Sequence, residues 1–130
     1  KLEGLNVNIK TYTIIPDEVE DIQTTFLTHV DNQVDLVIFT GGTGLSKRDV
    51  TPDALLPLID IEIPGISEAI RKHGQDRTPY SMLSRSLAGV RGQTLVLALP
   101  GSTKGASESM DAVFPGLLHI FQIFKGANHE

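Results

Sequence analysis

Two glycine-rich turns hold the residues of this chain whose types and spacing could do chemistry. The first reads Thr-Gly-Gly-Thr-Gly at residues 40–44, directly after an apolar run of strand length and shortly before a helix start. Glycine lets backbone N–H groups approach a ligand closely, and the following helix adds unpaired amides and the positive end of its dipole. The pattern predicts an anion-binding loop, although it matches neither the P-loop nor the dinucleotide-binding motif.

A second turn of the same kind follows an apolar run at residues 94–99. It reads Pro-Gly-Ser-Thr-Lys-Gly at residues 100–105 and leads into a long helical pattern. Ligands of open α/β sheets bind at the carboxyl ends of the strands, so both turns are expected to face one pocket. The predicted ligand-binding residues are Thr40, Gly41, Gly42, Thr43, Gly44, Gly101, Ser102 and Lys104, with Ser84 and Arg85 as a weaker pair that could be structural.

Two aspartates are candidates for a divalent cation. Asp49 lies in a charged run just after the first turn, and Asp17 follows a strand predicted at residues 6–15. Two carboxylates on the rim of the pocket could hold Mg²⁺ against phosphate oxygens. Both also have simpler interpretations, because Asp17 has the spacing to Glu20 of a helix cap and Asp49 could belong to a solvated charge cluster. Asp53, in the first turn of the next predicted helix, is explained by the helix dipole alone.

Composition limits the class of protein and of ligand. The chain has 130 residues, 40% of them hydrophobic and 21% charged, as expected for one soluble domain with a real core. A formal net charge of −5 at pH 7 argues against a nucleic-acid surface and favours a small anionic ligand. There is no cysteine, and the histidines are scattered singly, which disfavours thiol chemistry and zinc. Neither a membrane-spanning stretch nor a secretory signal is present, so the cytoplasm is expected.

Hydrophobic periodicity predicts the elements that position the turns. Strands are expected at residues 6–15, 34–40 and 94–99, the second of them central in the sheet. Helices are expected at residues 18–30, 51–59, 66–72, 80–88 and 106–124, the last with a kink at Pro115-Gly116. This order predicts a single three-layer, doubly wound α/β domain over residues 1–130, with a mostly parallel sheet and helices on both faces.

Four motifs carry a resemblance to a known family. They are T-G-G-T-G at residues 40–44, R-D-V-T-P-D at residues 48–53, M-L-S-R at residues 82–85, and L-P-G-S with K-G-A-S-E at residues 99–108. Together they resemble the molybdopterin-binding domain of molybdenum cofactor biosynthesis, of the MogA/MoaB type, to which the G domain of gephyrin is also similar. That family normally opens with a further strand and a Ser-Asp-containing loop, and we expect this domain to lack both.

The resemblance implies a molybdopterin adenylyltransferase. Such enzymes transfer AMP from ATP to the phosphate of molybdopterin, release pyrophosphate, use Mg²⁺ and are usually trimers. It implies that Asp17, in I-P-D-E, and Asp49, in R-D-x-T, are the catalytic and metal-binding aspartates. The expected partners are molybdopterin, ATP and further copies of the chain in a homotrimer, without nucleic acid or membrane. The alternative is a non-catalytic molybdopterin-binding or scaffold module, which could belong to a fusion with another cofactor-biosynthesis enzyme.

Overall fold

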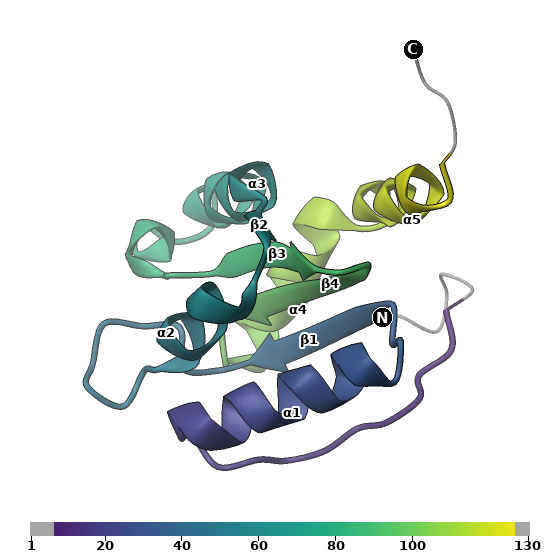
Figure 1. The fold of residues 1–130 in the computed structure, drawn as a ribbon. Coiled ribbons are helices and arrows are strands. Elements are labelled where there is room, and N and C mark those ends of the chain that lie inside the picture. Colours follow the sequence, from purple (N-terminus) through teal and green to yellow (C-terminus); the bar gives the residue numbers. More distant parts are fainter. Residues whose placement is uncertain (1–6, 127–130) are drawn as a thin grey trace.

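A four-stranded mixed sheet lies between two layers of helices in a computed structural model that describes residues 7–126 (Figure 1). The strand order is β1 (Leu36–Thr40), β4 (Thr94–Leu99), β3 (Leu87–Arg91) and β2 (Ile61–Glu62). β1 and β4 are parallel, whereas β3 is antiparallel to both of its neighbours. The predicted three-layer α/β class is confirmed, and the sheet is mixed where we expected it to be mostly parallel.

Helices cover both faces of the sheet. One face carries α1 (Val19–Asp31) and α2 (Thr51–Leu55), which continues into the 3₁₀ turn η2 (Leu56–Leu58). The other face carries α3 (Pro64–Gln75) and α4 (Thr103–Val113). The remaining helical pieces are the 3₁₀ turns η3 (Ser81–Leu83) and η4 (Gly116–Leu118) and the short helix α5 (His119–Phe124). Within residues 7–126, no helix is long and apolar enough to cross a membrane.

Strand β4 is the centre of the core, because all six of its residues are buried. Its side chains alternate between the two faces, as the pleat of a strand requires. Val96 and Ala98 join Ile22 and Phe26 of α1 in one apolar cluster. Leu95, Leu97 and Leu99 join the α3 and α4 side chains in the second cluster. The carboxyl end of β4 is therefore held from both sides.

The predicted strand at residues 6–15 is wrong for the part that the structure describes. Residues 7–15 contain no strand, and the segment leads as a loop into α1 (Figure 1). Tyr12 and Ile14 are 91% and 88% exposed, and Ile15 packs against the apolar cluster that contains α1. An alternating pattern forms a strand only where a neighbour accepts its backbone hydrogen bonds, and no described strand pairs with this segment.

Two further predictions need correction at the sheet. Among the described residues β1 is an edge strand, although its apolar run predicted a central one. β3 lies where the sequence predicted the end of a helix over residues 80–88 and a turn. Gly92, with φ of +61°, and Gln93 alone form the turn, so that Arg91 pairs with Thr94 in a hairpin. The buried run of β3 is a strand because it pairs with β4 in this hairpin. The periodicity of its own residues does not show that pairing.

Four of the five predicted helices are confirmed in place and corrected in extent, whereas the helix predicted at residues 80–88 is wrong, because the structure has the 3₁₀ turn η3 and then β3 there. α1 matches the helix expected at residues 18–30, and α3 begins at Pro64, two residues before the helix expected at residues 66–72. Proline is well placed in the first turn of a helix, because its missing N–H has no partner there anyway. The long helix expected to residue 124 ends at Val113, and η4 and α5 follow Pro115. A proline inside a helix removes a hydrogen bond and clashes with the preceding turn.

Candidate functional site between two glycine turns

Parallel pairing of β1 with β4 brings the two glycine turns together. Thr40 pairs with Leu99 at the last position of the ladder, and the Gly41 amide donates to the Leu99 carbonyl at 2.9 Å. A Cβ placed on Gly101 would lie 3.0 Å from the Gly41 Cα. The two backbones therefore approach each other more closely than any residue with a side chain would comfortably allow.

The first turn has a backbone that favours glycine. Gly41 and Gly42 have φ values of +98° and +69°, in the left-handed region. A Cβ on Gly42 would overlap the Thr51 side-chain oxygen, and the Thr51 amide donates to the Gly42 carbonyl at 3.1 Å. The turn is thereby packed against the start of α2.

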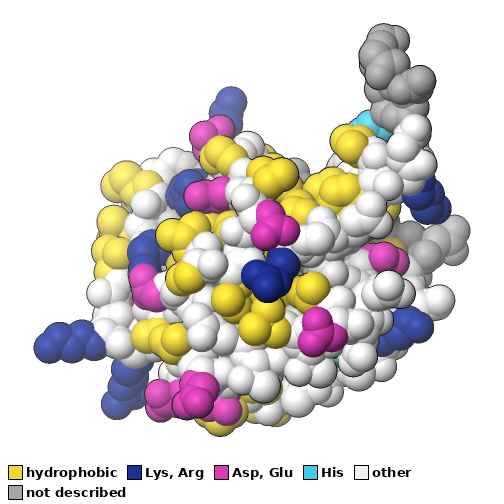
Figure 2. Space-filling model, viewed as in Figure 1, with side chains coloured by type: hydrophobic (Ala, Val, Ile, Leu, Met, Phe, Trp, Pro, Cys, Tyr) yellow, Lys and Arg dark blue, Asp and Glu magenta, His cyan; other side chains and the backbone are white. Residues whose placement is uncertain are grey.

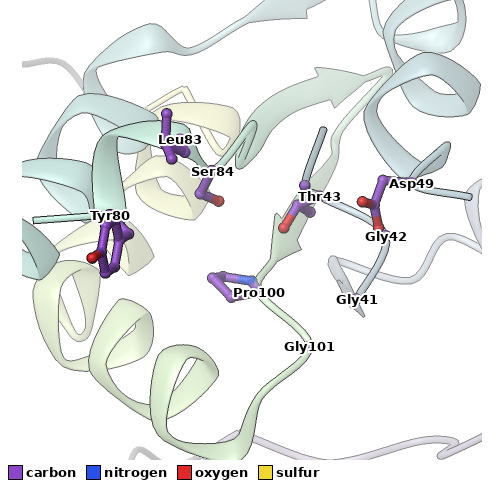
Figure 3. Close-up of a pocket in the computed structure, with 10 residues that line it drawn as sticks. Gly41, Gly42, Thr43, Asp49, Tyr80, Leu83, Ser84, Pro100 and Gly101 are labelled. Atoms are coloured by element: carbon purple, nitrogen blue, oxygen red, sulfur yellow. The ribbon is translucent and has the colours of Figure 1, made fainter. Parts of the chain in front are cut away.

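A pocket of about 420 Å³ lies between the two turns, a size typical of small-molecule sites. In Figure 3, Thr43 and Asp49 lie on one side of the pocket, Tyr80, Leu83 and Ser84 on the other, and Pro100 between them. The lining residues are Gly41, Gly42, Thr43, Gly44, Asp49, Tyr80, Leu83, Ser84, Pro100 and Gly101.

The carboxylate of Asp49 is held at the pocket by the chain that precedes it. Asp49 Oδ2 accepts hydrogen bonds from the Ser46 hydroxyl at 2.8 Å and from the Ser46 amide at 3.0 Å. These bonds, the hydroxyl bond first, lower the pKa of Asp49 below its ordinary value, so the group stays ionised. A Cβ on Gly44 would lie 2.7 Å from the same oxygen, so glycine leaves the space in which this carboxylate sits.

Most of the predicted binding residues line the pocket, and four do not. Arg85 lies outside it and donates to the Gly44 and Asp49 carbonyls. Thr40 is the exposed last residue of β1. Ser102 is the N-cap of α4, where its hydroxyl accepts from the Gly105 amide at 2.9 Å. Lys104 is exposed in the first turn of that helix.

Tyr80, Leu83 and Pro100 complete the pocket and were not among the predicted site residues. The signal that was missed is the hairpin: two apolar runs separated by Gly92-Gln93 predict the strand β3. Because β3 pairs with β4, the segment that precedes β3 lies at the edge of the sheet where the pocket is.

Asp17 lies in a second hollow, of about 340 Å³, with Glu18, Lys47, Arg48 and Val50. It does not cap α1, because the N-cap residue is Glu18 and no side chain makes a cap hydrogen bond there. The two predicted metal-binding aspartates thus line separate hollows, with the chain around residues 47–50 between them.

The donor set is compatible with Mg²⁺ only if a ligand supplies most of the oxygens. Among residues 7–126, no group of three or more His, Cys, Asp or Glu side chains could hold a metal ion. Mg²⁺ is commonly bound by one or two carboxylates together with substrate phosphates and waters. Asp49, ionised at the edge of the pocket, and Asp17 fit that chemistry as single carboxylates.

Comparison with known families agrees with the geometry. The family described as "Probable molybdopterin binding domain" matches residues 1–119. This chain belongs to that family.

Two curated relatives are similar to this chain over most of its length. Gephyrin from Dictyostelium discoideum is 42% identical over 118 residues, which are 90% of this chain and 16% of that protein. A molybdopterin adenylyltransferase from Haemophilus influenzae is 44% identical over 101 residues, 77% of this chain and 51% of that protein. The chain thus spans about half or less of the length of these two relatives.

Solved structures in the same family share the fold. The molybdopterin biosynthesis enzyme MoaB from Thermus thermophilus has a TM-score of 0.85 and 44% identity, covering 95% of this chain and 78% of that one. The molybdopterin biosynthesis Mog protein from Mycobacterium ulcerans has a TM-score of 0.91 and 35% identity, covering 97% of this chain and 82% of that one. The resemblance found in the four sequence motifs is confirmed.

Asp53 lies just outside the pocket and forms a two-pronged ion pair with Arg85. Both Arg85 terminal nitrogens donate to the two carboxylate oxygens of Asp53 at 3.1 Å. The hydrogen bond from Arg85 lowers the pKa of Asp53. The Asp53 side chain is 57% exposed and that of Arg85 34%, so solvent screens the pair.

We expect the Asp53→Asn variant to lose roughly 0–1 kcal/mol of unfolding free energy near neutral pH, the range for exposed pairs. The folded-state pKa is lowered, so this stability is fully present above the ordinary carboxyl pKa and is lost as pH falls through the folded value. Urea unfolding of both proteins across the acid range measures the difference. A difference that stays constant down to the lowest pH would show that the carboxylate charge does not contribute.

Proposed function

We propose that this chain transfers AMP from ATP to the phosphate of molybdopterin. The observation that carries the proposal is the close approach of the two glycine turns, so that glycines from both line one pocket at the carboxyl ends of β1 and β4. Relatives named molybdopterin adenylyltransferase support the reaction. The chain spans only part of those proteins, so the proposal rests on the pocket as well as on the relatives.

The second turn is suited to the terminal phosphate of molybdopterin. α4 begins directly behind Gly101, and the start of this eleven-residue helix is the positive end of its dipole, where the Ser102 hydroxyl takes only the Gly105 amide. Lys104 adds a cation in the first helical turn. A dianionic phosphate gains charge-assisted hydrogen bonds at such a place.

The wall of the pocket opposite Asp49 is suited to a flat ring system. Tyr80 and Leu83 line that wall, and both side chains remain accessible, at 71% and 49% exposure. Aromatic and aliphatic faces stack on planar heterocycles and exclude water from them. A pterin with its phosphate towards Gly101 would therefore use both kinds of surface.

The second hollow is suited to the polyphosphate of ATP. Lys47 and Arg48 provide two cations there, and basic side chains project from this end of the molecule (Figure 2). Asp17 and Glu18 supply carboxylates beside them. The two reactants would then occupy hollows on either side of one loop, with Asp49 on that loop.

No protein nucleophile is needed for this reaction. An oxygen of the molybdopterin phosphate attacks the α-phosphorus of ATP, a new P–O bond forms, and the bond to the β-phosphate oxygen breaks to release pyrophosphate. Mg²⁺, with Asp49 or Asp17 as a single carboxylate ligand beside the phosphates, would neutralise charge on the leaving pyrophosphate. The chain's own residues hold the phosphates in line and screen their mutual repulsion, which is the main protein contribution in phosphoryl transfer.

ATP as the co-substrate, Mg²⁺, the homotrimer and the cytoplasmic location are parts of this proposal that rest on the resemblance to the family. A second candidate is a module that binds molybdopterin without turnover. One observation favours it: Asp17 and Asp49 line separate hollows, whereas a metal shared by both would bring them to one.

We expect Asp49→Asn to reduce adenylyl transfer by about two to three orders of magnitude, as for removal of one group that stabilises developing charge. Asparagine keeps an oxygen that can accept from Ser46, so the loop should keep its shape. Pyrophosphate release with saturating ATP and Mg²⁺ is the measurement. Asp60→Asn is the matched control, since Asp60 also accepts a backbone amide, that of Gly92 at 2.8 Å, away from the pocket. Equal turnover in both variants would remove Asp49 from the reaction.

We expect Gly101→Val to weaken molybdopterin binding by about tenfold or more, because its side chain would enter the contact with Gly41 and displace the amides that face the phosphate. Isothermal titration calorimetry measures the affinity, and circular dichroism checks the fold. Gly65→Val is the control, because a Cβ there meets no atom within 4 Å. Wild-type affinity in a folded Gly101→Val protein would place the phosphate elsewhere.

A further inference from the structure

Arg85 does not line the pocket, yet it makes several hydrogen bonds to the first glycine turn and to the loop that follows it. Its Nε donates to the Gly44 carbonyl at 2.9 Å, and its Nη2 donates to the Asp49 carbonyl at 2.6 Å. Its backbone amide donates to the Thr43 carbonyl at 2.7 Å. The same guanidinium forms the two-pronged pair with Asp53 at the start of α2.

These contacts bracket the loop that carries Asp49. The loop leaves the turn at Gly44 and returns at Asp49, and residues 45–48 between them are exposed. Leu45, for example, is 68% exposed and contributes little packing. A loop with few buried contacts opens readily unless hydrogen bonds hold its ends. One guanidinium fixes both end carbonyls and so sets the distance between them.

Arginine suits this position for a geometric reason. Its planar group presents five donors in a fixed fork, so it can bond two carbonyls and a carboxylate at once. The lysine ammonium is a compact point charge on a flexible stem and does not reproduce that fork. Removing the fork would also leave two part-buried carbonyls without a partner, which costs free energy.

We propose that Arg85 is a positioning residue, whose guanidinium clamps the loop from Gly44 to Asp49 and thereby presents the Asp49 carboxylate to the pocket. The clamp acts through Asp49 and touches no reactant. Its consequence for turnover rests on the proposed function, whereas its effect on the loop stands on the contacts alone.

A purely structural arginine would behave differently. Arg91 is such a case: its Nη1 donates to the Leu58 carbonyl at 2.8 Å, at the far end of β3 from the pocket. Loss of a structural contact lowers the melting temperature but leaves kcat intact while the protein is folded. Loss of a clamp leaves a folded protein with a mobile loop and slow turnover. Arg91→Ala is therefore the matched control for Arg85→Ala.

Amide hydrogen exchange of the folded proteins tests the clamp directly. In Arg85→Ala, we expect exchange of the amides of Ser46, Asp49 and Thr51 to rise by about tenfold or more, while β4 keeps its protection. Arg91→Ala should leave these three amides as they are in the wild type. Arg85→Lys should behave like Arg85→Ala at the loop, and it gives the same comparison if the alanine variant does not fold.

Kinetics of the same variants test the consequence for the reaction. Below their melting temperatures, both Arg85 variants should lose about tenfold or more in kcat, with KM for molybdopterin changed far less. Unchanged loop exchange in Arg85→Ala, or full kcat in Arg85→Lys, would overturn the proposal. If the wild-type chain transfers no AMP, the proposed function fails, and the exchange comparison alone decides whether Arg85 is the clamp.

Discussion

The parallel pairing of β1 with β4 is the interaction on which the site depends. Two parallel strands end at the same edge of a sheet, so the chain that follows each one starts from the same place. β4 is buried along its whole length between two apolar clusters, and it fixes the register of β1. The glycine turns then meet closely because Gly101 has no side chain to hold the Gly41 backbone away. The core thus determines where the pocket lies, and the loops determine its lining.

Local sequence patterns were sufficient for the elements whose own hydrophobic pattern is strong. The amphipathic period of α1 and the continuous apolar runs of β1 and β4 predicted those elements close to their actual bounds. Both turns follow from glycines at strand ends, and so does their meeting at one pocket. The family was also predicted from motifs that include these turns, and its model matches residues 1–119.

Other elements depend on partners that a local pattern does not contain. Residues 7–15 alternate like a strand, yet the described part of the chain offers them no strand to pair with. The start of β3 was predicted as the end of a helix. It is a strand because it pairs with β4 in a hairpin, and this pairing is not visible in its local sequence. Arg85 is a similar case at the site. Its acceptors Gly44 and Asp49 are 41 and 36 residues away, and a backbone carbonyl has no sequence signature.

The claim that the two glycine turns bind one anion is tested most directly by titrating molybdopterin into ¹⁵N-labelled protein and following the backbone amide shifts by NMR. We expect the largest shifts at the amides of Gly42, Gly44 and Gly101 and in the first turn of α4, saturating with a single affinity. These amides come from both turns, so a common curve would mean a common ligand. Shifts confined to the hollow of Asp17, or spread over α5 with the turn amides unmoved, would contradict the account.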